Sequence, residues 1–264
     1  MSADKAGCEV CGSYINCQYR NERGDGADVC FLSPAPVFVT ISREAGTNAM
    51  ALASRLAAYL QEHDTEAICP WQVFNKTLIL NALESHHQPG WLAESLPEDK
   101  VSEIDALMME LFGGHPSIST LLKELEETIL KLADRGNVIL VGRASNVITA
   151  KLPGGVHVRL VGSVEKRLER LRTSEGFTGE EAAPFLRKED RARARFVRTY
   201  FNADIQEPLE YDLVINTDRM SVEESALMIA GVVLERHKKK MAKATALSAP
   251  IPSMVDAGSG EMKD

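Results

Sequence analysis

Short apolar runs that alternate with amphipathic stretches are the feature that most limits how this chain can fold. The runs that read as β-strands are 37–41, 138–141, 156–161 and 212–215. The stretches between them repeat apolar side chains at helical spacing, as Leu121, Leu125, Ile129 and Leu132 do. Apolar strands joined through helices are typical of a parallel sheet that is covered on both faces. We therefore predict an α/β fold in which a parallel β-sheet is flanked by helices.

Composition divides the 264 residues into three parts. Residues 1–36 are rich in glycine and cysteine and have neither helical nor strand periodicity. Residues 37–236 carry the α/β pattern and form the folded domain. Residues 237–264 begin with a basic cluster and continue into Ala, Ser, Pro and Gly. Such a tail buries too little apolar surface to offset its ordering entropy, so we expect it to be disordered.

Charge and hydropathy exclude several classes of protein. Lys and Arg number 30 against 38 Asp and Glu, and the net charge of −8 disfavours a nucleic-acid binder. No apolar run reaches 18 residues, and the first residues lack the basic-then-apolar plan of a signal peptide. Five cysteines are too few for a disulfide scaffold. We expect a cytoplasmic protein that binds neither membrane nor nucleic acid.

The loop after the first strand is a candidate phosphate-binding loop, because parallel sheets bind ligands at the carboxyl ends of their strands. Arg43 leads into a run of mostly small residues, which comprises Gly46, Thr47, Asn48, Ala49 and Met50. A loop of this kind before a helix can direct backbone N–H groups at a phosphate. The run lacks the lysine and the second glycine of the GxxxxGK[ST] pattern, and an ordinary strand-to-helix turn explains it equally well.

Two further positions have the chemistry to bind phosphate. After the second apolar strand, Gly142 permits close backbone approach and Arg143 offers a planar guanidinium, which could instead pair with a carboxylate at the sheet edge. Residues 187–198 contain six basic and two acidic side chains, a local charge of +4. Asp190 can hold Arg187 and Arg193 together on neighbouring helical turns for a polyanion. The alternative for such a run is a solvated helix face laced with ion pairs.

Taken in order along the chain, five stretches resemble the cytidylate kinase-like family of P-loop nucleoside monophosphate kinases. These stretches are 41–46, 70–76, 138–143, 190–193 and 211–216. The resemblance extends over residues 37–234, about three-quarters of the chain. It implies a central parallel sheet, a phosphate loop after the first strand, a region that binds the acceptor nucleotide, and a lid that carries arginines.

The resemblance also implies roles for individual residues. Residues 43–50 would bind the phosphates of ATP with its Mg²⁺, and Gly142 and Arg143 would hold the acceptor's monophosphate. Arg193, with Arg187 and Asp190, would act as the lid. Asn75 and Lys76 stand near the acceptor pocket, where many members have Asp-Lys.

The activity implied is phosphoryl transfer from ATP to a nucleoside monophosphate, with CMP or dCMP as the family default and small nucleotides as partners. Loss of glycines from the loop restricts the positive φ angles that a phosphate cradle needs. A catalytically weak nucleotide-binding or scaffold module with a degenerate phosphate loop is therefore the alternative.

The cysteines near the N-terminus suggest a separate metal site. Cys8, Cys11, Cys17 and Cys30 supply four soft ligands in a segment without a core of its own. Four thiolates can complete a tetrahedral Zn²⁺ site, and the metal would then supply the folding energy of the segment. Only one CxxC pair is present, so free thiols in a disordered leader are the alternative.

Overall fold

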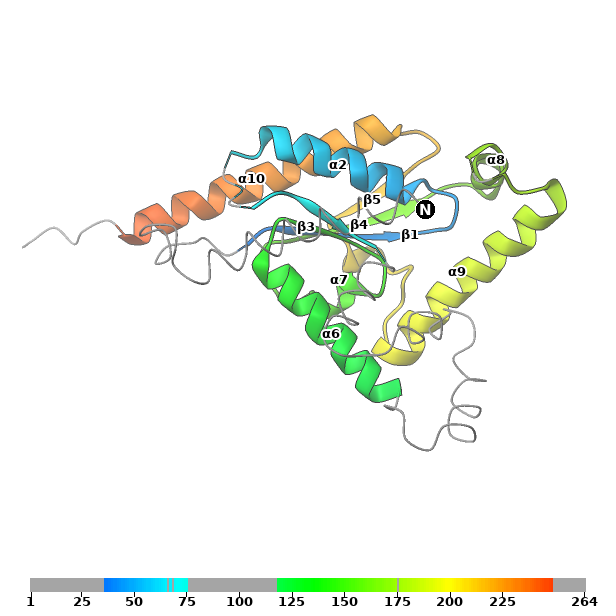
Figure 1. The fold of residues 1–264 in the computed structure, drawn as a ribbon, viewed down its shortest axis with the longest axis horizontal. Helices are drawn as coiled ribbons and strands as arrows, with labels where there is room; N and C mark the ends of the chain where they lie inside the picture. Colours follow the sequence, from blue (N-terminus) through cyan, green and yellow to red (C-terminus); the bar gives the residue numbers. More distant parts are fainter. Residues whose placement is uncertain (1–35, 66, 68, 76–117, 175, 249–264) are drawn as a thin grey trace, which may run out of the picture.

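The computed structural model describes residues 36–65, 67, 69–75, 118–174 and 176–248, and its centre is a five-stranded parallel sheet (Figure 1). The strands are β1 (Phe38–Arg43), β2 (Gln72–Phe74), β3 (Val138–Val141), β4 (Gly155–Val161) and β5 (Leu213–Asn216). Their order in the sheet is β2-β3-β1-β4-β5, and all four pairings are parallel. The α/β fold that the sequence predicts is confirmed.

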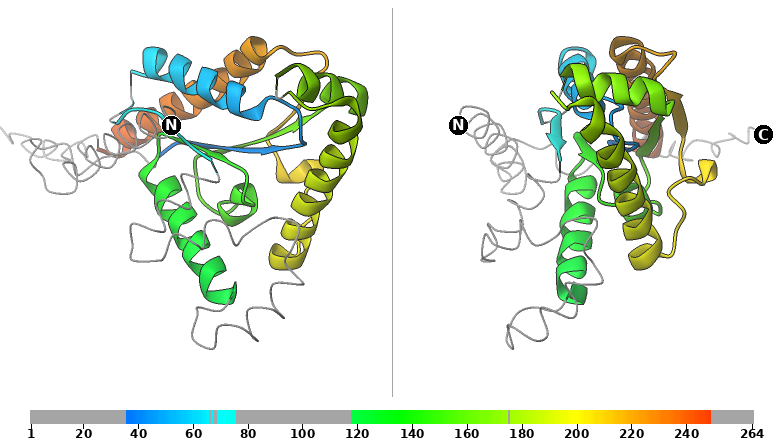
Figure 2. Two further views of the ribbon diagram at one scale, coloured as in Figure 1. Left: turned by 45° about the vertical axis from the view of Figure 1, so that its right-hand side comes forward. Right: turned by 90° about the vertical axis from the view of Figure 1, so that its right-hand side faces the viewer.

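Helices cover both faces of this sheet (Figure 2). On one face lie α2 (Ala49–His63) and α10 (Val222–Ser248). On the other lie α6 (Ile118–Arg135), the short α7 (Ser145–Ile148) and the carboxyl half of α9 (Gly179–Phe201). The helix α8 (Val164–Ser174) and the 3₁₀ turn η1 (Pro208–Glu210) complete the described elements.

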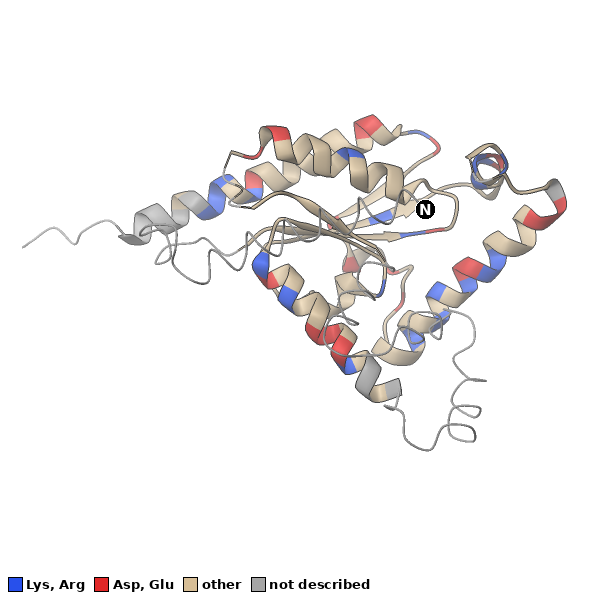
Figure 3. Cartoon of the chain, in the orientation of Figure 1, with Lys and Arg blue, Asp and Glu red and all other residues tan. Residues whose placement is uncertain are grey.

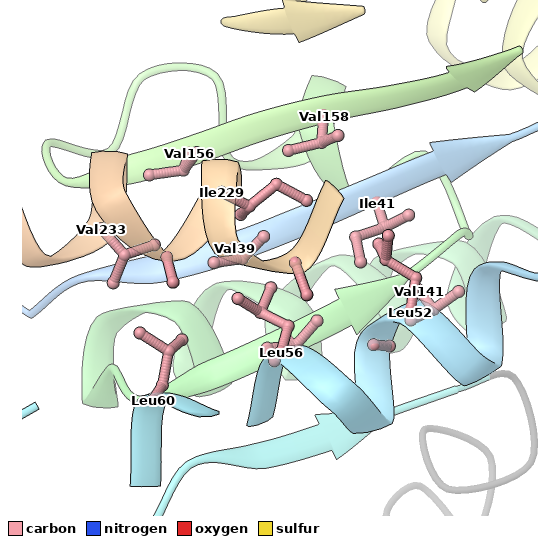
Figure 4. Packing of buried hydrophobic residues seen from close by; sticks show 14 of the residues in the cluster. Val39, Ile41, Leu52, Leu56, Leu60, Val141, Val156, Val158, Ile229 and Val233 are labelled. Carbon is pink, nitrogen blue, oxygen red and sulfur yellow. The ribbon is translucent and has the colours of Figure 1, made fainter. Parts of the chain in front are cut away.

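The two faces of β1 show why the sheet needs both layers. Because successive side chains of a strand point to opposite faces, Val39 and Ile41 pack with α2 and α10, while Phe38 packs with α6 and α9. Leucines one turn apart on α2, which include Leu52 and Leu56, close the first layer (Figure 4). Water is excluded from both layers around these residues, since each of the side chains named here is at most 2% exposed.

The chain beyond residue 236 differs from the sequence prediction. Disorder was expected from residue 237, but α10 continues to Ser248. His237 is only 6% exposed, and Nζ of Lys240 donates to the carbonyl oxygens of Pro36 and Pro153, at 3.2 Å each. These partners are distant in sequence, so composition alone did not indicate them. Within the described residues, no helix is long and apolar enough to cross a membrane.

A buried polar cluster ties the extended part of α10 to α2 and β2. Asp64, at the end of α2, accepts a hydrogen bond from the indole Nε1 of Trp71 (2.8 Å). Nδ1 of His237 lies 3.0 Å from the other carboxylate oxygen of Asp64. All three side chains are buried. A buried polar group is costly when it has no partner, so this cluster depends on its carboxylate.

Replacement of that carboxylate should destabilise the fold. Asp64→Ala leaves the Trp71 indole N–H and the His237 ring without their acceptor, and we expect a loss of about 2–4 kcal/mol in the free energy of unfolding, measured with urea. The control is Glu62→Ala, whose side chain is 77% exposed and whose effect should stay within about 0.5 kcal/mol. Equal unfolding midpoints for the two variants would contradict the assigned role of Asp64.

Candidate functional site

The loop between β1 and α2 has the backbone conformation of a phosphate cradle, although it contains a single glycine. Gly46 has a φ of 72° and Asn48, the residue before α2, has a φ of 56°. Asparagine enters the left-handed region more readily than most residues with a side chain. The loss of glycines was expected to restrict positive φ angles in this loop, but Asn48 takes such an angle itself.

The same loop presents backbone donors that no described residue uses. Among the described residues, no acceptor bonds the N–H groups of Gly46, Thr47 and Asn48, and no side chain caps the start of α2. The Thr47 hydroxyl turns inward and donates to the carbonyl of Glu44 (2.8 Å). Consecutive free N–H groups at the start of a helix form a concavity that favours anions.

A buried arginine of α8 holds this loop in place. Arg167, which is 5% exposed, donates through Nη1 to the carbonyl of Ala45 (3.3 Å) and to Oδ2 of Asp190 (2.6 Å). Its Nε donates to the carbonyl of Gly162 (3.0 Å) and lies 3.5 Å from the carboxylate of Glu44. Asp190 in turn accepts from the backbone N–H of Ala45 (2.7 Å). The loop, α8 and α9 are thus joined through one guanidinium and one carboxylate.

Arg43 points away from the loop that it precedes. A Cβ atom at Gly142, which has a φ of 86°, would overlap Nη1 of Arg43, so the absence of a side chain at Gly142 makes room for this guanidinium. Arg43 therefore reaches the carboxyl end of β3 rather than the donors of residues 46–48. This placement differs from the sequence interpretation, in which Arg43 belonged with the phosphate loop.

A small pocket at the same sheet edge gathers arginines from three distant segments. It is lined by Arg43 at the end of β1, by Gly142 and Arg143 after β3, and by Arg193 of α9, with Phe196 as an apolar wall. Arg143 has a φ of 56°, is 5% exposed and places its guanidinium 5.8 Å from the centre of the Phe196 ring. Convergent guanidinium groups of this kind suit the oxygens of a phosphate.

The structure brings together only part of the predicted lid cluster. Nη2 of Arg193 donates to Glu189 (2.7 Å), and its Nη1 lies 3.5 Å from Asp190. Arg187 is exposed and lies about 120° around the helix axis from Arg193, as six residues at 3.6 per turn require. Arg187 therefore does not line the pocket that contains Arg193.

Sequence reasoning missed a second buried arginine next to the pocket. Arg159 of β4 is 6% exposed and donates through Nη1 to the hydroxyl of Ser42 (2.8 Å), which also accepts from Tyr211 (3.3 Å). Burial lowers the pKa of the Arg159 guanidinium, because the charged form loses water. The available signal in the sequence was a charged residue inside an otherwise apolar strand, because charged side chains are rarely buried unless they are paired.

The remaining predicted positions divide between those inside and outside the described residues. Asn75 directly follows β2 and so lies at the same carboxyl edge of the sheet. Lys76 and the four N-terminal cysteines, Cys8, Cys11, Cys17 and Cys30, lie outside the described residues. Cys69 is described, and it is disulfide-bonded. In the part of the chain that the structure describes, no group of three or more His, Cys, Asp or Glu side chains could hold a metal ion.

Comparison with known proteins identifies the family. The model of the cytidylate kinase-like family matches residues 38–219, well over half of the chain. The chain belongs to the cytidylate kinase-like family. The match begins with β1 and ends after β5, so it includes the loop at residues 44–48 and every arginine of the pocket.

Individual relatives are similar at modest identity. A cytidylate kinase of Methanosphaerula palustris is 26% identical over 192 residues, which cover 72% of this chain and 94% of that protein. A cytidylate kinase of Pyrococcus horikoshii is 30% identical over 110 residues, 41% of this chain and 54% of that protein. A uronate isomerase of Corynebacterium glutamicum is 28% identical over 122 residues, 46% of this chain, and the match spans 23% of that protein's length.

A solved structure shows the same fold. It is the crystal structure of an uncharacterized protein from Eubacterium ventriosum, which is 18% identical and has a TM-score of 0.56. The alignment covers 75% of this chain and 97% of that chain.

The loop geometry makes a prediction about anion binding. An alanine Cβ at Gly46 would lie 2.7 Å from the carbonyl oxygen of Arg167 and would also disfavour the positive φ angle. We expect Gly46→Ala to weaken binding of inorganic pyrophosphate about tenfold, measured by calorimetry, since left-handed strain of about 1–2 kcal/mol corresponds to that factor. Asn48→Gly is the matched control and should bind as wild type does. Unaltered binding by a folded Gly46→Ala protein would contradict the assignment.

Proposed function

We propose that this protein transfers the γ-phosphoryl group of ATP to a nucleoside monophosphate. The observation that carries the proposal is the convergence of Arg43, Arg143 and Arg193 on one pocket, beside a loop with three backbone N–H groups available for an anion. Phosphoryl transfer needs this combination of donors, because its catalysis is mainly positioning and neutralisation of charge.

On the donor side, the N–H groups of Gly46, Thr47 and Asn48 would bind the phosphates of ATP. ATP enters as its magnesium complex, in which the ion neutralises the β- and γ-oxygens. The start of α2 adds the favourable end of a helix dipole. Arg167 contributes indirectly, because it fixes the loop through the carbonyl of Ala45.

On the acceptor side, Arg43 and Arg143 would hold the monophosphate, and Arg193 would neutralise the group in transfer. Arg43 is the last residue of β1 and Arg143 comes two residues after β3, so two neighbouring central strands position both arginines. Asp190 would act as a positioning residue, since its carboxylate meets the loop amide and the guanidinium of Arg167 and lies near that of Arg193. We propose Arg193 alone for the transfer step, because Arg187 does not line the pocket.

The acceptor base is proposed from the relatives rather than from the pocket. The two cytidylate kinases named above support CMP or dCMP as the acceptor. Asn75, at the end of β2, and Lys76 after it would contribute to recognition of the acceptor.

A second candidate function is nucleotide binding with little or no transfer, as a scaffold module with a degenerate phosphate loop. The observation in its favour concerns the cations nearest the loop among the described residues. Arg167 and Arg170 both donate to loop carbonyls, those of Ala45 (3.3 Å) and Gly46 (3.5 Å). Both guanidinium groups therefore point to carbonyl oxygens and not to the anion site that the N–H groups of residues 46–48 form. Met50, at the start of α2, supplies no charge there either.

A coupled assay of ADP release separates the two candidates. The purified chain would be incubated with ATP, Mg²⁺ and each nucleoside monophosphate in turn. Acceptor-dependent ADP release, fastest with CMP or dCMP, would support the kinase. ATP binding without any acceptor-dependent release would support the scaffold.

Truncation of the pocket arginine on α9 tests the transfer step. Arg193→Ala should lower kcat by about 10³-fold or more and leave ATP affinity nearly intact, because a cation that acts on transition-state charge contributes that much. Arg191→Ala, on the opposite face of the same helix, is the control and should retain wild-type kcat. A wild-type rate in Arg193→Ala would remove this arginine from the mechanism.

We also propose that, in the reduced chain, Cys8, Cys11, Cys17 and Cys30 bind one structural Zn²⁺; with five cysteines in the sequence, the disulfide of Cys69 has to open before all four thiolates are available. Their soft thiolate ligands support the proposal, as does the lack of helical or strand periodicity around them. Metal analysis of the full chain, purified without added zinc, should find about one equivalent, as a tetrahedral four-thiolate site requires. Cys8→Ser with Cys11→Ser should abolish it, and Cys69→Ser should not. Zinc that survives the double substitution would refute the site.

A further inference from the structure

The outer face of α9 carries a row of arginines that the proposed reaction does not use. We call Arg187, Arg191, Arg195 and Arg198 the arginine stripe. Arg191 lies about 160° around the helix axis from Arg193, so the stripe faces away from the pocket. All four side chains are exposed, and Figure 3 shows the concentration of basic residues along this helix.

The carboxylates of the same segment do not neutralise the stripe. Glu189 pairs with Arg193 (2.7 Å), and Asp190 pairs with Arg167 (2.6 Å), both on the inner side of the helix. Among the described residues, no carboxylate lies within ion-pairing distance of any arginine of the stripe. Like charges one helical turn apart repel each other, so the free protein holds these four cations together at a cost.

The stripe borders an open groove of about 440 Å³. Four cations line it, namely Arg187, Lys188, Arg191 and Arg195, with the small side chains of Pro184 and Ala192 between them. From Arg187 to Arg198 the stripe extends roughly 16 Å at a rise of 1.5 Å per residue. A single phosphate would meet only part of such a row.

We propose that this groove binds a linear polyphosphate chain, at a site separate from the nucleotide pocket. Guanidinium groups bind phosphate oxygens in a bidentate manner, and arginines one turn apart can engage successive phosphates in line. The inference does not depend on the proposed kinase activity, because it uses no residue of the pocket.

The chemistry of the groove favours polyphosphate over other polyanions. Among the described residues, its lining has no aromatic side chain on which a base could stack, and the whole chain has a net charge of −8, so single-stranded nucleic acid fits poorly. The described lining residues also include no neutral polar side chain that could bond a peptide backbone. The groove would therefore recognise its ligand by the density of negative charge on that ligand.

Calorimetric titration with inorganic tripolyphosphate tests the proposal. The full-length wild type should bind it saturably, and Arg191→Glu with Arg195→Glu should weaken that binding by about 30-fold or more, since two charge-assisted contacts become repulsive. Lys123→Glu with Lys131→Glu makes the same charge change on exposed positions of α6 and should have little effect. Arg193→Ala should retain the stripe-dependent binding, which separates this site from the pocket.

Four outcomes would overturn the proposal. They are no saturable binding by wild type, an equal loss in the α6 control, abolished binding in Arg193→Ala, and tighter binding of oligoglutamate or of a single-stranded oligonucleotide of equal charge. If the glutamate variant fails to fold, Arg191→Gln with Arg195→Gln replaces it, and a loss of about tenfold is then expected.

Discussion

The guanidinium of Arg167 is the contact on which the candidate site depends. It is nearly excluded from water and bonds the loop after β1, the turn after β4 and the carboxylate of Asp190 on α9. A buried charge is tolerated only when its partners are in place. Three segments distant in sequence must therefore assemble together, and a change at any one of them alters the position of the other two.

This arrangement also explains the loop's tolerance of sequence change. The cradle at residues 46–48 depends on two positive φ angles and on contacts to α8, rather than on a number of glycines. Asn48 supplies one of those angles, and the backbone of Arg167 leaves room only for glycine at position 46. The loop can therefore depart from the usual motif and keep its donors.

Much of the fold could be predicted from the sequence, because four of the five strands lie in short, mostly apolar runs that local composition identifies. The strand β2 was not predicted, since three residues are too few for a periodic pattern. The helical extension of α10 was not predicted either, because its partners, Asp64, Pro36 and Pro153, are distant in sequence. At the site, Gly142 and Arg143 could be predicted from their place after a strand. The sequence marks Arg159 only as a charge within an apolar strand and does not mark Arg167 at all, because Ser42 and Asp190, their side-chain partners, lie more than 20 residues away.

The hydrogen bonds of Lys240 determine which side of the molecule would face a surface or a fused protein. Its ammonium group bonds the carbonyl of Pro36, just before β1, and that of Pro153, just before β4. The first described residue and the C-terminal helix therefore meet at the amino edge of the sheet, and the anion-binding loop lies at the carboxyl edge. A surface tether or a fusion partner joined at residue 36 would start from the side opposite that loop. Immobilisation through this point should leave the nucleotide entrance facing solution.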